Sequence, residues 1–292
     1  MKCKLCKSEN TKINNKLNIR NGSFGKQAKE KFEILLCTNC EVQHLKPFPG
    51  LDIEYYSSGE YRRDYTKKDI DIDHYFSVSD NLSSQFANTI GINYFRNKTV
   101  ADIGCGAGSF LDVIKGVAAK TIAVEPTEIY HKPLKDRGHL VLNSLSDLNS
   151  ESCDVITSFD VIEHVESPLD FLIMKRDALR KGGRLFCLTP NSNDILTKLD
   201  IDNFDEFYYR TVHLWYFNKR SFEWMAKQAN FSNYNISYLH CYDLSNFVLW
   251  LKDNMPTGNA KIPIFDDRIN SQWKSFLESQ GMSDNIWLKA KK

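Results

Sequence analysis

The sequence has 292 residues, a length that suits one catalytic domain with a smaller module attached. Its hydrophobic content of 42% is enough for a substantial core, and its formal net charge of +1 offers no overall field to attract a polyanion. No stretch approaches the roughly 20 apolar residues of a membrane span, and the N-terminus lacks the apolar core of a signal peptide. We therefore expect a cytoplasmic protein without a membrane span, and a nucleic-acid partner is disfavoured.

Two Cys-x-x-Cys pairs stand out in the N-terminal region, and Asn21-Gly22 between them predicts a hairpin that brings them together. The four residues are Cys3, Cys6, Cys37 and Cys40. Two such knuckles make a closed tetrahedral site with no open coordination position. We therefore expect residues 1–50 to form a zinc ribbon whose structural Zn²⁺ substitutes for a core too small to fold alone. A redox dithiol and unliganded thiols are the alternatives.

Residues 51–98 are expected to connect this ribbon to the rest of the chain. The prolines of Lys46-Pro-Phe-Pro-Gly50 favour an extended start. A tyrosine-rich segment from Tyr55 to Tyr65 follows, and it either packs on the catalytic domain, which we favour, or covers its cofactor site. Residues 74–97 have an apolar stripe at helical spacing and lead into the first strand of the next region.

A glycine-rich turn follows the apolar strand that begins near Val100. Its glycines are Gly104, Gly106 and Gly108. Glycine tolerates positive φ and lets a ligand approach backbone amides at a helix N-terminus. A second apolar strand ends in Glu125, whose carboxylate suits two ribose hydroxyls. The pair predicts an adenosine-containing cofactor, with a purely structural turn as the alternative. The early third glycine disfavours a dinucleotide.

Strand and helix patterns alternate from residue 99 onward. Strands are predicted at 99–103, 120–125, 139–142, 154–159 and 184–189, with a helix over 168–181. Two later strands, at 234–242 and 284–290, flank a helical insertion over about 244–280. The pattern predicts an α/β fold with a parallel sheet between helices and a final antiparallel pair.

The glycine spacing, with Asp102 ahead of it, resembles motif I of class I S-adenosylmethionine (SAM) dependent methyltransferases. The resemblance implies a Rossmann-like domain over 99–292, with a mostly parallel seven-stranded sheet and a reversed last strand. In this family Asp102 would help to hold the methionine amino group, Asn143 to Leu145 would flank the adenine, and Phe159 would line the methionine end. The cofactor-binding set so implied is Asp102, Gly104, Gly106, Gly108, Glu125, Pro126, Ser144, Leu145 and Phe159.

Three residues are candidates for taking a proton from the acceptor. Asp160 and His164 follow the fourth strand in a segment that resembles methyltransferases of the ubiquinone-biosynthesis type. Neutral-range titration suits histidine as a base, but for His164 we favour the alternative, a histidine that fixes its loop by a backbone hydrogen bond, and Asp160 could be a turn residue. His213 precedes Trp215 and Tyr216 in a segment that resembles the family's acceptor-facing stretch.

The whole chain resembles bacterial class I methyltransferases with an N-terminal zinc ribbon, a group associated with surface-glycan and nucleotide-sugar biosynthesis. The features that carry this likeness are the two cysteine pairs, Lys46-Pro-Phe-Pro, Glu54 to Tyr61, motif I, Phe159 to Pro168, His213 to Phe217 and the closing strand. Glu41 departs from the glycine that is usual after the second knuckle.

This resemblance implies O-methylation of a sugar hydroxyl on a nucleotide-linked or lipid-linked glycan precursor, with a homodimer as one candidate assembly. Two alternatives remain open. One is an rRNA or tRNA methyltransferase that uses the ribbon to bind RNA, and the other is a non-catalytic SAM-binding protein.

Overall fold

The computed structural model describes residues 1–22, 26–49, 53–61, 63, 71–199, 201, 203–258 and 260–292. The chain divides into two compact units. The first, here called the ribbon unit, consists of residues 1–49, 188–225 and 235–288. The second, the glycine-turn unit, consists of residues 50–187, 226–234 and 289–292. The boundaries that the sequence suggests, at 50/51 and 98/99, stay predictions.

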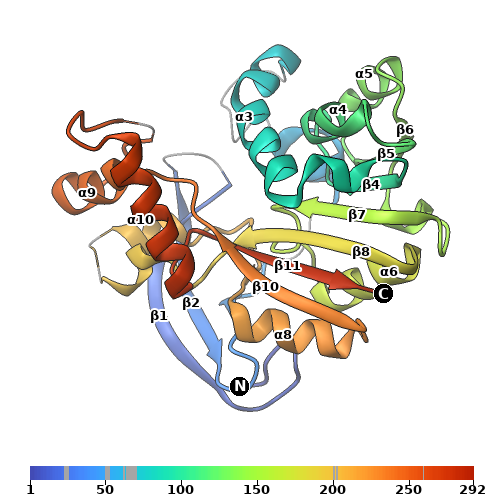
Figure 1. Ribbon diagram of the computed structural model, residues 1–292. Helices are drawn as coiled ribbons and strands as arrows, with labels where there is room; N and C mark the ends of the chain where they lie inside the picture. The colour runs from blue at the N-terminus through green and yellow to red at the C-terminus, as the bar shows by residue number, and fades with distance from the viewer. Residues whose placement is uncertain are drawn as a thin grey trace. The chain divides into compact units, whose positions relative to one another are not determined.

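A seven-stranded sheet has the order β10-β11-β8-β7-β4-β5-β6 (Figure 1). Its strands are β4 (Thr99–Ile103), β5 (Lys120–Val124), β6 (Leu140–Leu142), β7 (Cys153–Phe159), β8 (Leu179–Pro190), β10 (Asn233–Leu239) and β11 (Asn285–Lys291). β4 pairs in parallel with β5 and β7, and β5 pairs in parallel with β6. These strands form where apolar runs predict them, and the alternating strand and helix pattern explains why they lie parallel.

The last strand, β11, runs against β8. Lys292 N–H donates to Gly183 O (3.0 Å), and Asn191 N–H donates to Asp284 O (2.8 Å). Residue numbers rise along β8 as they fall along β11, which is antiparallel pairing. The mostly parallel sheet with a reversed last strand is therefore confirmed.

The helices of the glycine-turn unit are α1 (Ile53–Ser57), α3 (Ile72–Ile90), α4 (Ser109–Lys115), α5 (His131–Asp136) and α6 (Pro168–Ala178), with 3₁₀ turns η1 (Ile92–Phe95), η2 (Glu128–Tyr130) and η3 (Leu145–Asp147). The side chain of Asp71 caps α3, and Gly91 ends it at φ 95°. The helix expected over 168–181 is too long, because Leu179 already begins β8. Arg180 is held by Asp154, and Gly182 and Gly183 pair with Lys292, so this stretch is extended.

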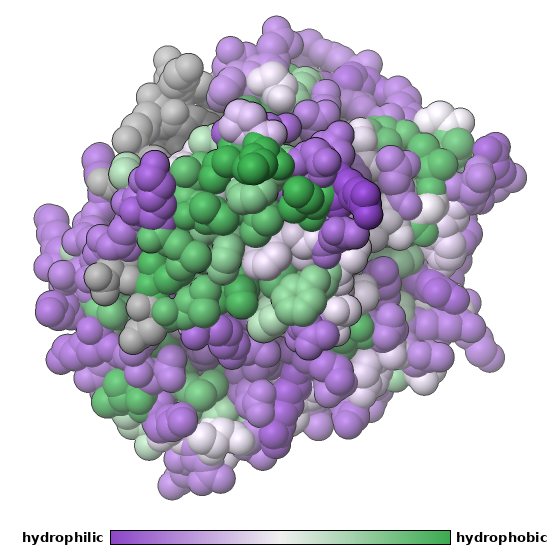
Figure 2. All heavy atoms as spheres, turned by 60° about the vertical axis from the view of Figure 1, so that its left-hand side comes forward, coloured by the Kyte–Doolittle hydropathy of each residue, from purple (hydrophilic) through white to green (hydrophobic). Residues whose placement is uncertain are grey.

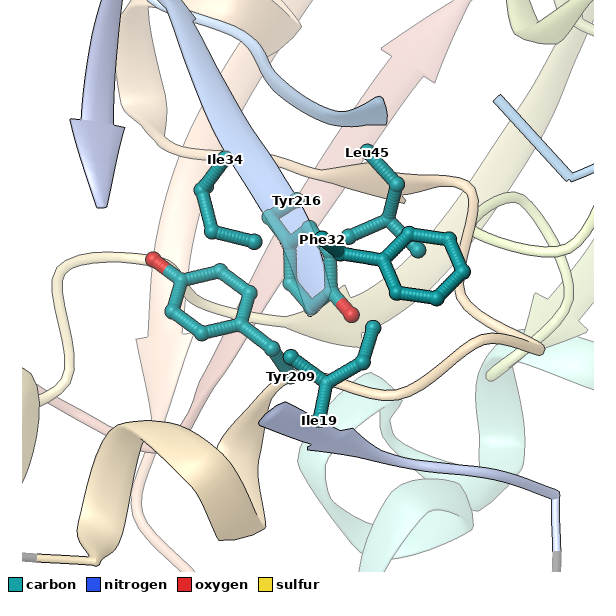
Figure 3. Close-up of a cluster of buried hydrophobic side chains, with 6 residues drawn as sticks. All are labelled: Ile19, Phe32, Ile34, Leu45, Tyr209 and Tyr216. Carbon is teal, nitrogen blue, oxygen red and sulfur yellow. The ribbon is translucent and has the colours of Figure 1, made fainter. Parts of the chain in front are cut away.

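The ribbon unit contains a second sheet, in the order β1-β2-β3-β9. Its strands are β1 (Thr11–Arg20), β2 (Gln27–Cys37), β3 (Gln43–Lys46) and β9 (Trp215–Tyr216). β1 and β2 pair in antiparallel fashion, as the predicted hairpin requires. β9 was not predicted, because two residues carry no periodic signal. Side chains of this sheet and of residues 209–216 form one hydrophobic cluster, drawn in Figure 3: Ile19, Phe32, Ile34, Leu45, Tyr209 and Tyr216.

The remaining helices are η4 (Ile195–Lys198), α7 (Phe204–Tyr208), α8 (Lys219–Gln228), α9 (Leu244–Asp253) and α10 (Asp267–Gln280). α9 and α10 form the helical stretch expected near 244–280. Exposed apolar side chains gather in this region, and Figure 2 shows a hydrophobic area on the face that carries it. They are Leu251, Met255, Ile264 and Phe276. Among the described helices, none combines the length and the hydropathy required to cross a bilayer.

Candidate active site

The glycine turn after β4 has no room for side chains. Gly104, Gly106 and Gly108 have φ angles of 75°, 54° and 92°. A Cβ at Gly106 would lie 2.4 Å from the hydroxyl oxygen of Tyr75. Cβ atoms at Gly104 and Gly108 would each lie 2.5 Å from a neighbouring side-chain carbon. The turn therefore needs glycine for both backbone conformation and space, as the sequence predicts.

Glu125 stands at the end of β5, beside this turn. Gly106 N–H donates to its Oε2 (2.8 Å), and Thr127 N–H donates to its Oε1 (2.9 Å). Each carboxylate oxygen has about two acceptor positions, so each retains one for a further donor. A ribose presents two neighbouring hydroxyls to such a carboxylate. The turn and the fixed carboxylate therefore fit the adenosine part of SAM.

Asp102, next to the last residue of β4, is a buried carboxylic acid. Its side chain accepts a hydrogen bond from Thr157 Oγ1 (2.6 Å). Burial raises the pKa of Asp102 to about 7, although the Thr157 hydrogen bond lowers it. A cationic ligand group would stabilise the ionised form, so the site suits the amino group of SAM.

Lys175 of α6 contributes a buried positive charge near the same strands. Its side chain is fully buried, and its Nζ lies 3.7 Å from the centre of the Phe171 ring. Burial lowers the pKa of Lys175 to about 8, whereas nearby Cys187, Asp102 and Glu163 raise it. The ammonium group therefore offsets part of the negative charge that Asp102 places in the core.

The other predicted cofactor residues follow β5 and β6 or, in the case of Phe159, end β7. Pro126 is exposed, and Leu145 is buried. Ser144 begins η3, where its hydroxyl accepts from Ser146 N–H (3.2 Å). The ring of Phe159 packs between those of Phe86 (4.7 Å) and Phe110 (4.9 Å). Because β7, β4, β5 and β6 are neighbours, these residues lie along one edge of the sheet with the glycine turn. Their binding roles stay predictions.

The first two proton-acceptor candidates, Asp160 and His164, follow β7 in the glycine-turn unit. Asp160 is exposed and has φ 54°, as a turn residue would. His164 is buried, and its Nδ1 lies 3.2 Å from the Tyr56 hydroxyl oxygen. Thr127 Oγ1 donates to the backbone oxygen of Tyr56 (3.0 Å). The tyrosine segment therefore packs where β5 and β7 end; its last member, Tyr65, lies outside the described residues.

The third candidate, His213, belongs to the ribbon unit. Its side chain is buried, and its ring centre lies 6.0 Å from that of Tyr216. Its backbone N–H donates to Arg210 O (3.0 Å).

The glycine turn is held in place by two side chains whose contacts the sequence does not predict. Tyr75 of α3 donates from its hydroxyl to Cys105 O (3.5 Å) and closes over Gly106. Arg137 donates to Ala107 O and pairs with the carboxylate of Asp112 through its Nε (2.9 Å). Tyr75 lay in a predicted helix without a signal for its long-range partner, and Arg137 carried no motif at all.

The four N-terminal cysteines converge in the ribbon unit. Their Sγ atoms all lie within 4.8 Å of one another, and the Cys3–Cys40 and Cys6–Cys37 pairs are 3.8 Å and 3.5 Å apart. A Zn–S bond of about 2.3 Å places the sulfurs of a tetrahedral site about 3.8 Å apart. The donor set therefore fits zinc. Glu41 has φ 58°, which explains why glycine is usual at this position.

Comparison with known proteins agrees with this geometry. Residues 78–236, more than half of the chain, match the family model described as "Methyltransferase domain". The mitochondrial ubiquinone biosynthesis O-methyltransferase of Candida albicans is 33% identical over 32% of this chain and 32% of its own length. The tRNA U34 carboxymethyltransferase of Actinobacillus succinogenes is 33% identical over 36% of this chain and 37% of its own. The chain thus spans about a third of the length of these two relatives.

A solved structure supports the fold. A SAM-dependent methyltransferase from Archaeoglobus fulgidus superposes with a TM-score of 0.53, covering 75% of this chain and 97% of that one at 18% identity. The order of strands, the fit of the glycine turn and Glu125 to SAM, and the family match all agree. The chain belongs to the SAM-dependent methyltransferases of the class I fold.

Proposed function

We propose that this enzyme moves the methyl group of SAM to a hydroxyl oxygen of a small-molecule acceptor. SAM supplies a methyl group on a sulfonium, which is an excellent leaving group. The protein therefore needs mainly to align donor and acceptor and to take the proton of the hydroxyl. A relative named as a ubiquinone biosynthesis O-methyltransferase supports oxygen as the acceptor atom.

The observation that carries this proposal is the position of His164. It is buried in the loop after β7, the strand beside β4 and its glycine turn. The Tyr56 hydroxyl orients the ring by its contact with Nδ1 (3.2 Å). In the tautomer in which Nδ1 donates its proton to Tyr56, Nε2 is the basic nitrogen, and the contact is compatible with this base-competent form.

His213 is a second candidate on the acceptor side. It lies next to an aromatic stretch that includes Trp215 and Tyr216, which would shield an acceptor from water. Asp160 is the weakest of the three candidates, because its exposure and left-handed backbone suit a turn.

The acceptor class that we infer is a sugar hydroxyl on a nucleotide-linked or lipid-linked glycan precursor. This inference depends on the likeness of the ribbon, the connector and the site segments to the glycan-associated group. RNA is a second candidate, because a relative is named as a tRNA U34 carboxymethyltransferase. The net charge of +1 counts against RNA, which needs a basic surface.

We also propose that the four cysteines hold one structural Zn²⁺ per chain. The support is the mutual approach of their Sγ atoms within 4.8 Å. Elemental analysis of the purified full chain would measure it, and a preparation that is folded yet holds no zinc would contradict it.

Transfer of labelled methyl from SAM tests the function. Nucleotide sugars, lipid-linked sugars and total tRNA would be offered separately, and the labelled product would be identified by mass spectrometry. We expect label as a methyl ether on a small molecule, and loss of transfer in His164→Asn with SAM binding retained. Label that enters only RNA would refute the leading proposal in favour of the second.

A further inference from the structure

Residues 209–218, here called the His213 segment, pair through their backbone with β3 on one side and with the end of β1 on the other. On one side, β9 pairs with β3, and His44 lies opposite Trp215. On the other side, Arg20 N–H donates to Tyr209 O (3.2 Å), and Thr211 N–H donates to Arg20 O (2.9 Å). His213 lies between these two attachments in the sequence.

Side chains strengthen both attachments. Tyr209 and Tyr216 belong to the same hydrophobic cluster as Ile34 of β2 and Leu45 of β3 (Figure 3). The hydroxyl of Tyr209 donates to Gln43 Oε1 (2.6 Å). The aromatic side chains of the segment thus complete a core that the ribbon strands cannot fill alone.

Each cysteine knuckle reaches the segment through a specific contact. In the first knuckle, Lys4 Nζ lies 4.6 Å from the centre of the Phe48 ring. The Phe48 ring in turn meets the Trp215 ring edge-on, with 5.3 Å between the ring centres. In the second knuckle, Glu41 accepts a hydrogen bond from Asn218 Nδ2 (3.1 Å) and pairs with Arg220 (2.9 Å).

Without its metal such a ribbon loses its main stabilisation, because a small four-cysteine module folds on the metal that it binds. β9 has only two residues and depends on β3 for its pairing. We infer that the four-cysteine site is a clamp that positions the His213 segment, so that metal occupancy controls use of the acceptor but not binding of SAM. This inference depends on the proposed zinc and on the proposed acceptor role of His213.

Hydrogen exchange on the full chain tests the clamp directly. Exchange would be compared between the zinc-loaded protein and the protein stripped with a chelator, both with saturating SAM. We expect amides of residues 209–218 to exchange roughly tenfold faster after stripping, while those of residues 99–125 keep their rates. Unchanged rates in 209–218, or equal loss of protection in both regions, would overturn the clamp.

Two matched variants separate the clamp from metal binding itself. Lys7 and Glu41 both have left-handed backbone, with φ 60° and 58°, so glycine relieves the same strain at each. Within the described part of the chain, the Lys7 side chain donates to Lys4 O (2.7 Å), a residue of its own knuckle, whereas Glu41 reaches Asn218 and Arg220. We expect Glu41→Gly to raise the acceptor KM several-fold and to speed exchange in the His213 segment. Zinc content and SAM affinity should stay as in the parent. Lys7→Gly should change none of these, and identical behaviour of the two variants would contradict the proposal.

The His213→Ala variant distinguishes failure of the proposed acceptor role from failure of the clamp. If His213→Ala transferred methyl normally while stripping still released residues 209–218, the clamp would stand and the acceptor role of His213 would fall. If His213→Ala were inactive and stripping released nothing, the acceptor role would stand and the clamp would fall.

Discussion

SAM should bind more weakly as the pH falls below 7, because Asp102 must lose its proton to hold the amino group of the cofactor. Burial raises the pKa of this carboxyl to about 7. About half of the free enzyme then has ionised Asp102 at pH 7, and about 1% has it at pH 5. The amino group of the ligand, with an ordinary pKa of about 7.7–8.0, stays charged over this range. The dissociation constant should therefore rise about 50-fold from pH 7 to pH 5, which is about 2 kcal/mol.

Isothermal titration calorimetry with SAM at pH 5, 6 and 7 measures this dependence. Near pH 6.5 binding should also release a proton, which appears as a dependence of the heat on the ionisation enthalpy of the buffer. Asp102→Asn is the matched variant, because it keeps the size of the side chain and cannot ionise. It should bind weakly, with an affinity that does not change with pH. Equal SAM affinity of the parent protein at pH 5 and pH 7, or a variant whose affinity changes with pH as the parent's does, would refute this role of Asp102.

Three further predictions concern the same edge of the sheet. Asp102→Asn should be more stable than the parent at pH 7, by up to about 4 kcal/mol, because the raised pKa of Asp102 means that the parent loses stability as the pH rises from about 4 to 7. Urea unfolding at pH 4 and pH 7 measures this, and a difference in unfolding free energy between variant and parent that is the same at both pH values would contradict it. Glu125→Ala should bind SAM at least tenfold more weakly in calorimetry, and normal binding would remove the ribose assignment. Gly106→Ala should lower both the melting temperature and SAM affinity, because its Cβ would lie 2.4 Å from the Tyr75 hydroxyl oxygen. A variant with the parent's melting temperature and affinity would contradict this and mean that Tyr75 moves aside at little cost.

The parallel sheet was predictable because its strands are short apolar runs bounded by turns. The predicted strand over 99–103 coincides with β4, and the one over 154–159 differs from β7 by one residue. The end of α6 was not predictable, because residues 179–183 are extended by partners at Asp154 and Lys292, far away in sequence. Local patterns carry no information about such partners.

The site shows the same division between local and long-range information. Motif spacing was enough to place Gly106 and Glu125 together, and the structure links them by a hydrogen bond of 2.8 Å. Motif spacing could not reveal the position of Tyr75 over the turn or the pairing of His44 with Trp215, since both contacts join distant parts of the chain. Glu41 looked like a mere departure from the family pattern, yet its side chain joins the second knuckle to Asn218.

The most direct test of the account is a crystal structure of the full chain with S-adenosylhomocysteine, the product of methyl transfer. We predict that the ribose hydroxyls will lie within hydrogen-bond distance of Glu125, that the amino group will face Asp102, and that the sulfur will point towards the loop carrying His164. A cofactor bound away from the glycine turn, or a ribose without contact to Glu125, would contradict the account.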